Sequence, residues 1–339
     1  MAHQDIVVIG TSAGGVVALL ELMKSLPKDF GASIFIVQHI PPYSHSNLPA
    51  ILNRESPIPA AHAIDGEPIQ KRKIYIAPPD HHLLIEDDRI LVKKGPKENR
   101  FRPSIDALFR SAAYVYGSRV VGVILSGLLD DGTSGLWTVK RLGGTCIIQE
   151  PEEAAFPSMP KSVLEYVDVD HILPIQKIGP LLHRLTKQPS TQQPIRLSKE
   201  EIKRIQVETN IAAQDNAFEL GILELGKFTP FTCPECNGIL VEIKEGKLTR
   251  FRCHTGHAFT DTALLAGITK SIEDDLWQTV RGMEEAVMLL EQRGKQIEAD
   301  GEQHKAESFY RKARDTRDQI HAIRTQIFQQ QRMGDDLGP

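Results

Sequence analysis

Short apolar runs alternate with segments of helical periodicity over roughly residues 5–185, and this alternation constrains the fold more than any other feature of the chain. Most of the runs are apolar almost without interruption, as is typical of strands buried on both faces. Strands that alternate with helices form a mostly parallel sheet covered by helices. We therefore expect a doubly wound α/β domain over residues 1–186. The expected strands are 6–10, 33–39, 73–77, 82–86, 89–93, 119–127 and 145–150, and the expected helices are 14–26, 104–116 and 132–142.

Two of these strands are separated only by Asp87 and Asp88, which predicts a β-hairpin on the domain. The sequence after the domain divides into three further segments. Residues 187–228 start as a polar, proline-containing linker, and they include a short helix that Ser198 caps. Residues 229–262 hold a cluster of Cys and His. Residues 263–333 carry two apolar stripes with steps of three and four, which predict a helical hairpin or a coiled coil.

The composition narrows the class of protein. The chain has 339 residues, enough for about two domains, and 41% of them are apolar. A formal net charge of −4 gives no indication of binding to nucleic acid or to an anionic membrane. The sequence contains neither a signal-peptide pattern nor an apolar stretch long enough to span a membrane. Three of the four cysteines lie close together, which fits a reducing compartment and one metal site. We therefore expect a cytoplasmic protein.

The stretch VVIGTSAGG, residues 7–15, allows two interpretations. As a phosphate-binding loop it lacks the second glycine of the dinucleotide fingerprint, where Ser12 stands, and it lacks the lysine of a P-loop. A helix N-terminus can still bind an anion without either motif. As a G-x-S-x-G turn it would present Ser12 as a nucleophile, with the amides of the first helical turn facing a developing oxyanion. The alternative is a tight turn whose serine caps the helix.

Two other strand ends supply partners for Ser12. His39 directly follows the second expected strand, and Asp130 and Asp131 follow a later one. Functional groups of a doubly wound sheet gather at the carboxyl ends of its strands, so these side chains should meet at one edge. A serine needs a base, and the base needs a group that orients it. The order Ser, His, Asp along the chain excludes an ordinary α/β-hydrolase, in which the acid precedes the histidine.

Six motifs follow one another along the first 185 residues: VVIGTSAGG, FIVQH, YIAPPDHHLL, RPSIDALFRSAA, VILSGLLDDGTSGL and GGTCIIQEPEEAAFPSMP. In this order they resemble the catalytic domain of the bacterial chemotaxis protein-glutamate methylesterases. The resemblance implies a doubly wound α/β fold. It also implies hydrolysis of glutamyl methyl esters on chemoreceptor signalling helices, often together with deamidation of glutamine at the same sites.

The resemblance also assigns roles. It implies Ser12 as nucleophile and His39 as general base. The family pattern G-M-G-x-D-G falls on residues 127–132, so the acid falls on Asp131 and not on Asp130. Members of the family usually carry an N-terminal receiver domain that phosphorylation controls, and this sequence starts at the catalytic strand. We therefore expect either constitutive activity or regulation by the C-terminal half or by a partner in trans.

Five residues around the expected triad carry weaker expectations. The backbone amides of Ala13 and Leu128 are the candidate oxyanion donors. Leu128 and Leu129 replace the usual methionine and glycine of the family, and a leucine at the second position stiffens a turn that normally tolerates positive φ. Arg102 is either a surface residue or a contact for acidic side chains beside a methylated glutamate. Met159 lies in a loop that resembles the one beside the family's active site, so it is a candidate pocket residue.

The Cys/His segment has the spacing of a zinc ribbon. A C-x-x-C knuckle, Cys233 and Cys236, is followed after sixteen residues by Cys253, and the sequence between them reads as a β-hairpin. Cys253, the two knuckle cysteines and one histidine form a tetrahedral set that suits structural zinc. His257 can fold back on the metal, whereas the adjacent His254 would point away. Basic and acidic residues alternate on this segment, which favours a solvated surface over a nucleic-acid interface.

These observations favour a serine hydrolase of the protein-glutamate methylesterase type, with methylated chemoreceptor helices as its protein substrate and no catalytic cofactor. The alternative is a non-catalytic signalling scaffold that forms homo-oligomers through its C-terminal helices. A nucleotide-binding protein that uses the glycine-rich helix start is a third interpretation.

Overall fold

A computed structural model describes residues 3–187, 197–214 and 217–336. The described chain forms two compact units, residues 1–264 and 265–339. Most of the polar stretch expected to open the linker lies outside the described residues. The first unit combines the α/β domain with the Cys/His segment, so these parts of the sequence-based division pack together in one body.

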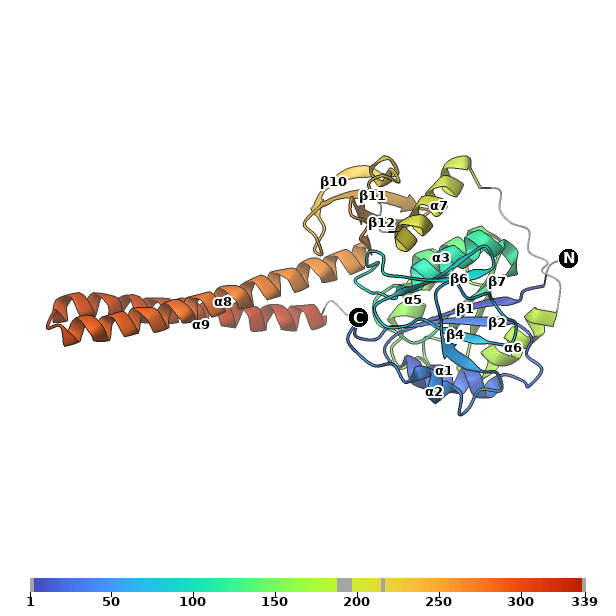
Figure 1. Cartoon of the computed structure of the whole chain (residues 1–339), viewed down its shortest axis with the longest axis horizontal. Coiled ribbons are helices and arrows are strands. Elements are labelled where there is room, and N and C mark those ends of the chain that lie inside the picture. Colours follow the sequence, from blue (N-terminus) through green and yellow to red (C-terminus); the bar gives the residue numbers. More distant parts are fainter. Residues whose placement is uncertain (1–2, 188–196, 215–216, 337–339) are drawn as a thin grey trace. The chain divides into compact units, whose positions relative to one another are not determined.

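A seven-stranded parallel sheet forms the centre of the first unit, in the order β3-β4-β2-β1-β7-β8-β9 (Figure 1). This confirms the α/β class. The two edge strands β3 and β9 were not predicted, because each has only three residues and is half exposed, so neither forms an apolar run. The strands are β1 (Ile6–Thr11), β2 (Ser33–Gln38), β3 (Ala60–His62), β4 (Ile74–Ile76), β7 (Val120–Ile124), β8 (Thr145–Gln149) and β9 (His171–Leu173).

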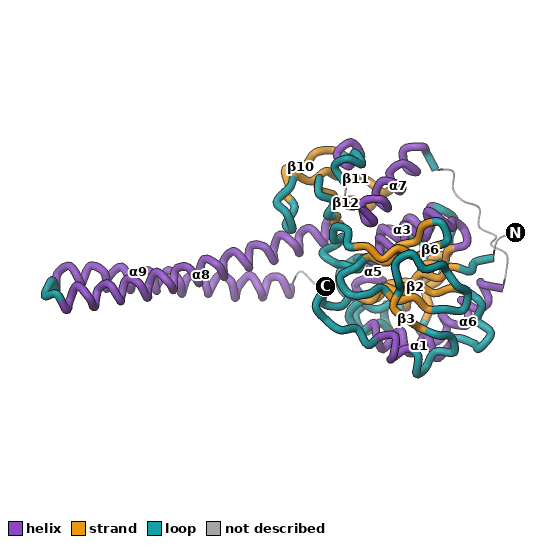
Figure 2. Tube along the Cα trace, in the orientation of Figure 1, coloured by secondary structure: helices purple, strands orange, loops and turns teal. Residues whose placement is uncertain are grey.

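Helices cover both faces of this sheet (Figures 1 and 2). Alternate residues of β1 show why its apolar run is continuous: Ile6 and Val8 enter one hydrophobic cluster, and Val7 and Ile9 enter the other. Helices α3, α4 and α5 supply the first cluster, and α1, α2 and α6 supply the second. The helices are α1 (Gly15–Ser25), α2 (Leu48–Leu52), α3 (Ile105–Tyr116), α4 (Thr133–Arg141), α5 (Ser158–Tyr166) and α6 (Ile175–Lys187).

The expected hairpin is present as β5 (His82–Glu86) and β6 (Arg89–Lys93), which pair antiparallel. Asp87 and Asp88 both have positive φ, as a two-residue hairpin turn requires. The predicted cap at Ser198 is also present, since Ser198 and Glu201 exchange side chain-to-backbone hydrogen bonds before helix α7 (Lys199–Gln214).

The Cys/His segment forms a four-stranded antiparallel sheet that packs with α7 on the α/β domain (Figure 1). Three arginines and three glutamates form a buried ionic cluster between these parts. In it, Arg252 bridges Glu98 of the α/β domain and Glu208 of α7. The remaining members are Arg110, Glu245 and Arg250. The strands are β10 (Lys227–Thr232), β11 (Ile239–Glu245), β12 (Leu248–Cys253) and β13 (Ala258–Thr260).

Two long helices, α8 (Asp261–Ala299) and α9 (Gln303–Asp336), confirm the predicted helical hairpin. They run side by side (Figures 1 and 2) around an apolar seam that includes Val280, Val287 and Ile320. Among the described residues, no helix combines the length and the apolarity that crossing a membrane requires.

Candidate active site

Ser12 lies in the turn between β1 and α1. Its amide donates a hydrogen bond to Ser126 O, in the turn after β7, at 3.0 Å. Gly14, two residues on, has φ +72°, a conformation that favours glycine. Gly127 approaches from the neighbouring turn so closely that a Cβ there would lie 3.0 Å from the Cβ of Ser12 and 1.9 Å from Met159 Sδ. Small residues therefore allow two strand ends to meet at the serine.

His39 follows β2 at the same edge of the sheet. Its Nε2 and Asp131 Oδ2 are 2.8 Å apart, and both side chains are at least 97% buried, with exposed fractions of 3% and 1%. The ring of Phe101 stacks on the imidazole. His39 Nδ1 is buried and has no hydrogen-bond partner within the described residues. The nitrogen that contacts the acid is thus Nε2, whereas in the chymotrypsin-type triad it is Nδ1.

Asp131 accepts several further hydrogen bonds from the start of α3 and from the loop before it. Its Oδ2 accepts from the Ile105 amide at 2.7 Å, and its Oδ1 accepts from Ser104 Oγ and from Asn99 Nδ2, each at 3.0 Å. Burial alone would raise the pKa of the Asp131 carboxyl, but the hydrogen bond and charge of His39, together with these donors, hold its pKa below the ordinary value. The carboxylate is therefore kept ionised at the N-terminus of a helix.

Asp130 occupies a different environment from its neighbour. Its side chain is buried, its Oδ1 has no hydrogen-bond partner in the described part of the chain, and no hydrogen bond or ion pair there joins it to His39. Burial raises the pKa of Asp130 to about 7, the nearby charge of Asp131 adds to this, and hydrogen bonding by Thr260 opposes it. Of the two candidate acids, the structure brings Asp131 to the histidine.

Ser12 and His39 line one cavity of about 530 Å³, although no hydrogen bond joins their side chains within the described residues. Basic and aromatic side chains from the loop before α3 complete its wall. The cavity is lined by Ser12, Ala13, His39, Ile40, Pro41, Pro42, Asp80, Lys97, Arg100, Phe101 and Arg102.

Of the two candidate oxyanion donors, Ala13 lines the cavity together with Ser12, and Leu128 follows Gly127, the residue that approaches Ser12. Within the described residues, neither the Ala13 amide nor the Leu128 amide donates a hydrogen bond. Leu129 has φ +61°, the conformation that the family's glycine adopts without strain. The leucine therefore keeps the shape of the turn at some conformational cost.

The two candidate pocket residues differ in their positions. Arg102 lines the cavity, and its guanidinium donates to Asp80 Oδ1 and to Gly95 O, so it is partly neutralised. Met159 does not line the cavity, contrary to expectation. It is fully buried behind the Gly127 turn, because it is the second residue of α5, whose apolar face packs into the core.

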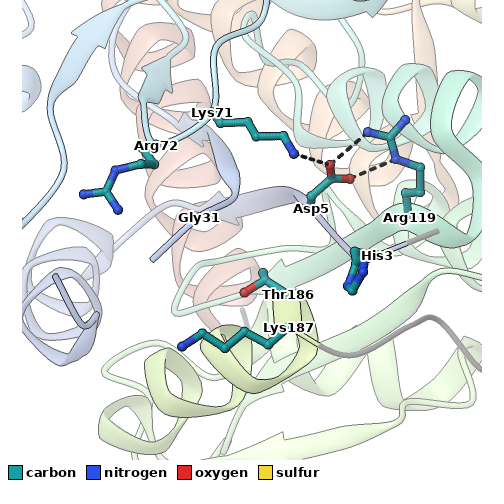
Figure 3. Close-up of a pocket in the computed structure, with 8 residues that line it drawn as sticks. All are labelled: His3, Asp5, Gly31, Lys71, Arg72, Arg119, Thr186 and Lys187. Carbon is teal, nitrogen blue, oxygen red and sulfur yellow. Dashed lines mark hydrogen bonds and ion pairs between the residues drawn. The ribbon is translucent and has the colours of Figure 1, made fainter. Parts of the chain in front are cut away.

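A second cavity, of about 710 Å³, lies at the opposite edge of the sheet, where the strands begin (Figure 3). Asp5 there pairs with Arg119 and Lys71. Figure 3 shows basic side chains around it and no Ser or Cys that could act as nucleophile.

Cys233, Cys236, Cys253 and His257 come together in the ribbon, with their ligand atoms all within 4.8 Å of one another. The histidine presents Nδ1, which lies 3.6 Å from Cys253 Sγ and 3.7 Å from Cys233 Sγ. His254 packs against Gly238 outside this group. Three sulfur donors and one imidazole form a set that can hold one metal ion, and of the two histidines it includes His257.

Sequence reasoning missed side chains that contact the expected triad, among them those of Asn99, Phe101 and Ser104. Asn99 and Ser104 donate to Asp131, and Phe101 stacks on His39. Ser104 was expected only to start the helix, which it also does. No motif spacing marks Asn99 or Phe101, because the loop that holds them is placed by tertiary contacts.

Comparison with known proteins places this site in a family. The family model described as CheB methylesterase matches residues 7–182. A Leptospira interrogans protein, provisionally named protein-glutamate methylesterase/protein-glutamine glutaminase, is 40% identical over 184 residues, which cover 54% of this chain and 95% of that protein. A Thermotoga maritima relative, named protein-glutamate methylesterase/protein-glutamine glutaminase, is 40% identical over 51% of this chain, and the match covers only 52% of that relative.

A solved structure agrees with these matches. The crystal structure of the Thermotoga maritima CheB methylesterase catalytic domain has a TM-score of 0.52 and 38% identity. The match covers 55% of this chain and 99% of that domain, so it reaches the α/β part and leaves the remainder of the chain unmatched. The chain therefore belongs to the CheB methylesterase family.

Proposed function

We propose that this protein is a serine hydrolase that removes methyl esters from glutamate side chains of chemoreceptor proteins. The observation that carries the proposal is the buried contact of 2.8 Å between His39 Nε2 and Asp131 Oδ2, beside a cavity that Ser12 also lines. The relatives that bear the name protein-glutamate methylesterase/protein-glutamine glutaminase support the same reaction class.

In the first half-reaction, Ser12 Oγ attacks the ester carbonyl carbon and His39 Nδ1 takes the hydroxyl proton. Nδ1 is the ring nitrogen that Asp131 leaves free. The amides of Ala13 and Leu128 bind the oxyanion. When the tetrahedral intermediate collapses, the C–O bond to the methoxy group breaks, the leaving oxygen takes the proton from His39, and methanol departs.

In the second half-reaction, water attacks the glutamyl ester of Ser12 while His39 Nδ1 takes a proton from it. Collapse of the second intermediate returns this proton to Ser12 and releases the glutamate carboxylate. Asp131 fixes the imidazole and stabilises its positive form in both steps. A glutamine side chain would give the same acyl-enzyme with ammonia as the leaving group, so deamidation is part of the proposal.

The wall of the cavity suits an acidic protein surface. Lys97, Arg100 and Arg102 line it, and only Arg102 shares its charge with an aspartate of the cavity itself. We propose that these side chains contact carboxylates beside the methylated glutamate on a receptor helix. Lys97 pairs with Glu235 in the free protein, at 2.9 Å, and can exchange that exposed partner at little cost.

The Cys/His group fits a structural zinc ion. Cys233, Cys236, Cys253 and His257 make a closed four-ligand set with no position left for substrate, and none of them lines the cavity of Ser12. When bound, zinc would hold the ends of the ribbon strands together, and the proposed proton transfers and acyl transfers use side chains alone.

The test is methanol release from a methylated chemoreceptor fragment. We expect release by the wild-type protein and a loss of at least about a thousandfold in Ser12→Ala and His39→Ala. Ser118→Ala, a half-buried serine outside the site, is the matched control and should retain the wild-type rate. Undiminished release by Ser12→Ala would contradict the nucleophile. Binding of the fragment without any release would favour the signalling scaffold, and a protein stabilised by nucleotides would favour the phosphate-binding interpretation.

A further inference from the structure

The loop of residues 97–101, between β6 and α3, lies between the ribbon and the proposed triad. On the triad side, Asn99 Nδ2 donates to Asp131 Oδ1 at 3.0 Å and Phe101 stacks on His39 with ring centroids 3.8 Å apart. Two of the three triad members therefore depend on this one loop for their environment.

On the ribbon side, Glu98 anchors the loop. Its Oε1 accepts from Arg252 Nη2 at 2.7 Å, and Arg252 immediately precedes Cys253, a member of the metal-binding group. Glu98 is fully buried, and the charges of Arg110 and Arg252 overcome the effect of burial and hold its pKa well below the ordinary value. A buried carboxylate of this kind needs its arginines, because an unpaired buried charge is strongly destabilising.

Asn99 makes the second anchor. The backbone N–H of Asn99 donates to Ala258 O at 2.7 Å, and the side-chain Oδ1 of Asn99 accepts from the backbone N–H of Thr260 at 3.0 Å. Ala258 immediately follows His257, another member of the metal-binding group. Asn99 is 2% exposed, so water does not replace these partners. One side chain thus accepts a hydrogen bond from the ribbon through its oxygen and donates to Asp131 through its nitrogen.

We propose that the ribbon positions the catalytic triad through Asn99, so that binding of metal to Cys233, Cys236, Cys253 and His257 is required for hydrolysis although the metal takes no part in the chemistry. Small zinc-binding segments owe much of their folding free energy to the metal. Loss of metal would release the ends of β12 and β13, and with them the partners of Glu98 and Asn99. The activity readout rests on the proposed function.

The experiment uses the full chain and three measurements: zinc content, methanol release, and the downfield NMR resonance of the His39 ring N–H that bonds to Asp131. That resonance is assigned by its absence in His39→Gln. We expect about one zinc per chain, loss of both the resonance and at least about 90% of the rate on chelation, and recovery of both when zinc is added back. Retention of the resonance and the rate in metal-free protein would overturn the proposal, as would a chain that binds no zinc.

Chelation can also lower the rate by unfolding the protein. A variant that keeps its metal but breaks the link through Asn99 separates loss of triad positioning from unfolding. Asn99→Asp keeps an oxygen for the Thr260 backbone amide, but it replaces the nitrogen that donates to Asp131 Oδ1 and to Asp106 Oδ2 with a carboxylate oxygen. We expect it to bind zinc, to lose or shift the His39 resonance, and to lower kcat by about tenfold to a hundredfold with little change in KM. An unchanged kcat and resonance would overturn the inference. His254→Ala, beside the ligands but outside their group, should leave zinc content and rate unchanged.

The two proposals fail in different ways. If wild-type protein releases no methanol, the proposed function fails, and the response of the His39 resonance to metal and to Asn99→Asp still decides the inference. If methanol is released but neither the rate nor the resonance depends on metal or on Asn99, the function stands and the inference fails.

Discussion

The ring of Phe101 lies flat on the imidazole of His39, with the centroids 3.8 Å apart and the planes inclined by 10°. Because Asp131 contacts Nε2, the imidazole is held at one edge by the acid and across its face by the aromatic ring. The remaining nitrogen, Nδ1, is the one available to Ser12.

Replacing Phe101 should therefore disturb the base without removing any proton-transfer group. We expect Phe101→Ala to lower kcat by about tenfold, because the freed ring samples orientations that do not face Ser12. Phe101→Tyr keeps the aromatic face and should retain most of the rate. Methanol-release kinetics measure both. Equal rates for Phe101→Ala and wild type would show that the stack does not orient His39.

Substitutions of the two adjacent aspartates should lower kcat to very different extents. Asp131→Asn keeps the size of the side chain but removes the charge that stabilises the imidazolium, and we expect a loss of about 10³–10⁴ in kcat. Asp130→Asn should stay within about threefold of wild type, since no hydrogen bond or ion pair among the described residues joins Asp130 to His39. The same assay measures both variants, and the reverse ranking would move the acid to Asp130.

Asp130 should instead affect stability, in a pH-dependent way. Its pKa is raised to about 7 in the folded protein, chiefly by burial. The folded state therefore binds this proton more tightly than the unfolded state does, and the resulting stability is present below about pH 4 and lost as the pH rises to about 7. Above pH 7, Asp130→Asn removes a buried charge and should raise the free energy of unfolding by a few kcal/mol.

Thermal unfolding at pH 5 and pH 8 measures this difference. The Tm of Asp130→Asn should exceed that of wild type by more at pH 8 than at pH 5. Asp318→Asn, on the exposed surface of α9, is the control and should shift the Tm equally at both pH values. An Asp130→Asn effect that is the same at both values would contradict the raised pKa.

The turn at Gly127 should tolerate no side chain. A Cβ there would lie 1.9 Å from Met159 Sδ, so Gly127→Ala forces the core residue or the serine turn to move. We expect a loss of about 1–3 kcal/mol in stability and a lower rate. Urea unfolding and methanol release measure the two effects. Gly31→Ala, where a Cβ meets no atom within 4 Å, should change neither, and Met159→Ala should partly rescue Gly127→Ala.

The buried ionic cluster should be sensitive to loss of one partner. Glu208 accepts from both Arg250 and Arg252, and its side chain is 1% exposed. Glu208→Ala leaves two guanidinium groups undercompensated and should cost about 3–5 kcal/mol in urea unfolding. Arg281→Ala, whose side chain is 75% exposed, should cost less than about 0.5 kcal/mol. A small cost for Glu208→Ala would show that water or the remaining glutamates satisfy the arginines.

Local sequence patterns predicted the long, strongly patterned elements. The apolar run at 6–10 became the central strand β1, and the Cys/His spacing predicted all four residues that meet in the ribbon, Cys233, Cys236, Cys253 and His257. The short edge strand at Ala60–His62 escaped prediction, because three half-buried residues carry no period. The prediction that Met159 lines the cavity was wrong. The motif fixes the position of Met159 in the chain but not the direction in which its side chain packs.

The sequence by itself determined the alternation of strands and helices, and with it the edge at which Ser12, His39 and Asp131 gather, because strand periodicity and burial are properties of consecutive residues. Tertiary structure decided which imidazole nitrogen contacts the acid and which groups hold that acid ionised. It also decided that Asn99 joins Asp131 to the strand that follows His257. Those contacts join residues from 26 to 161 positions apart, and their strength depends on shared burial, which no local pattern records.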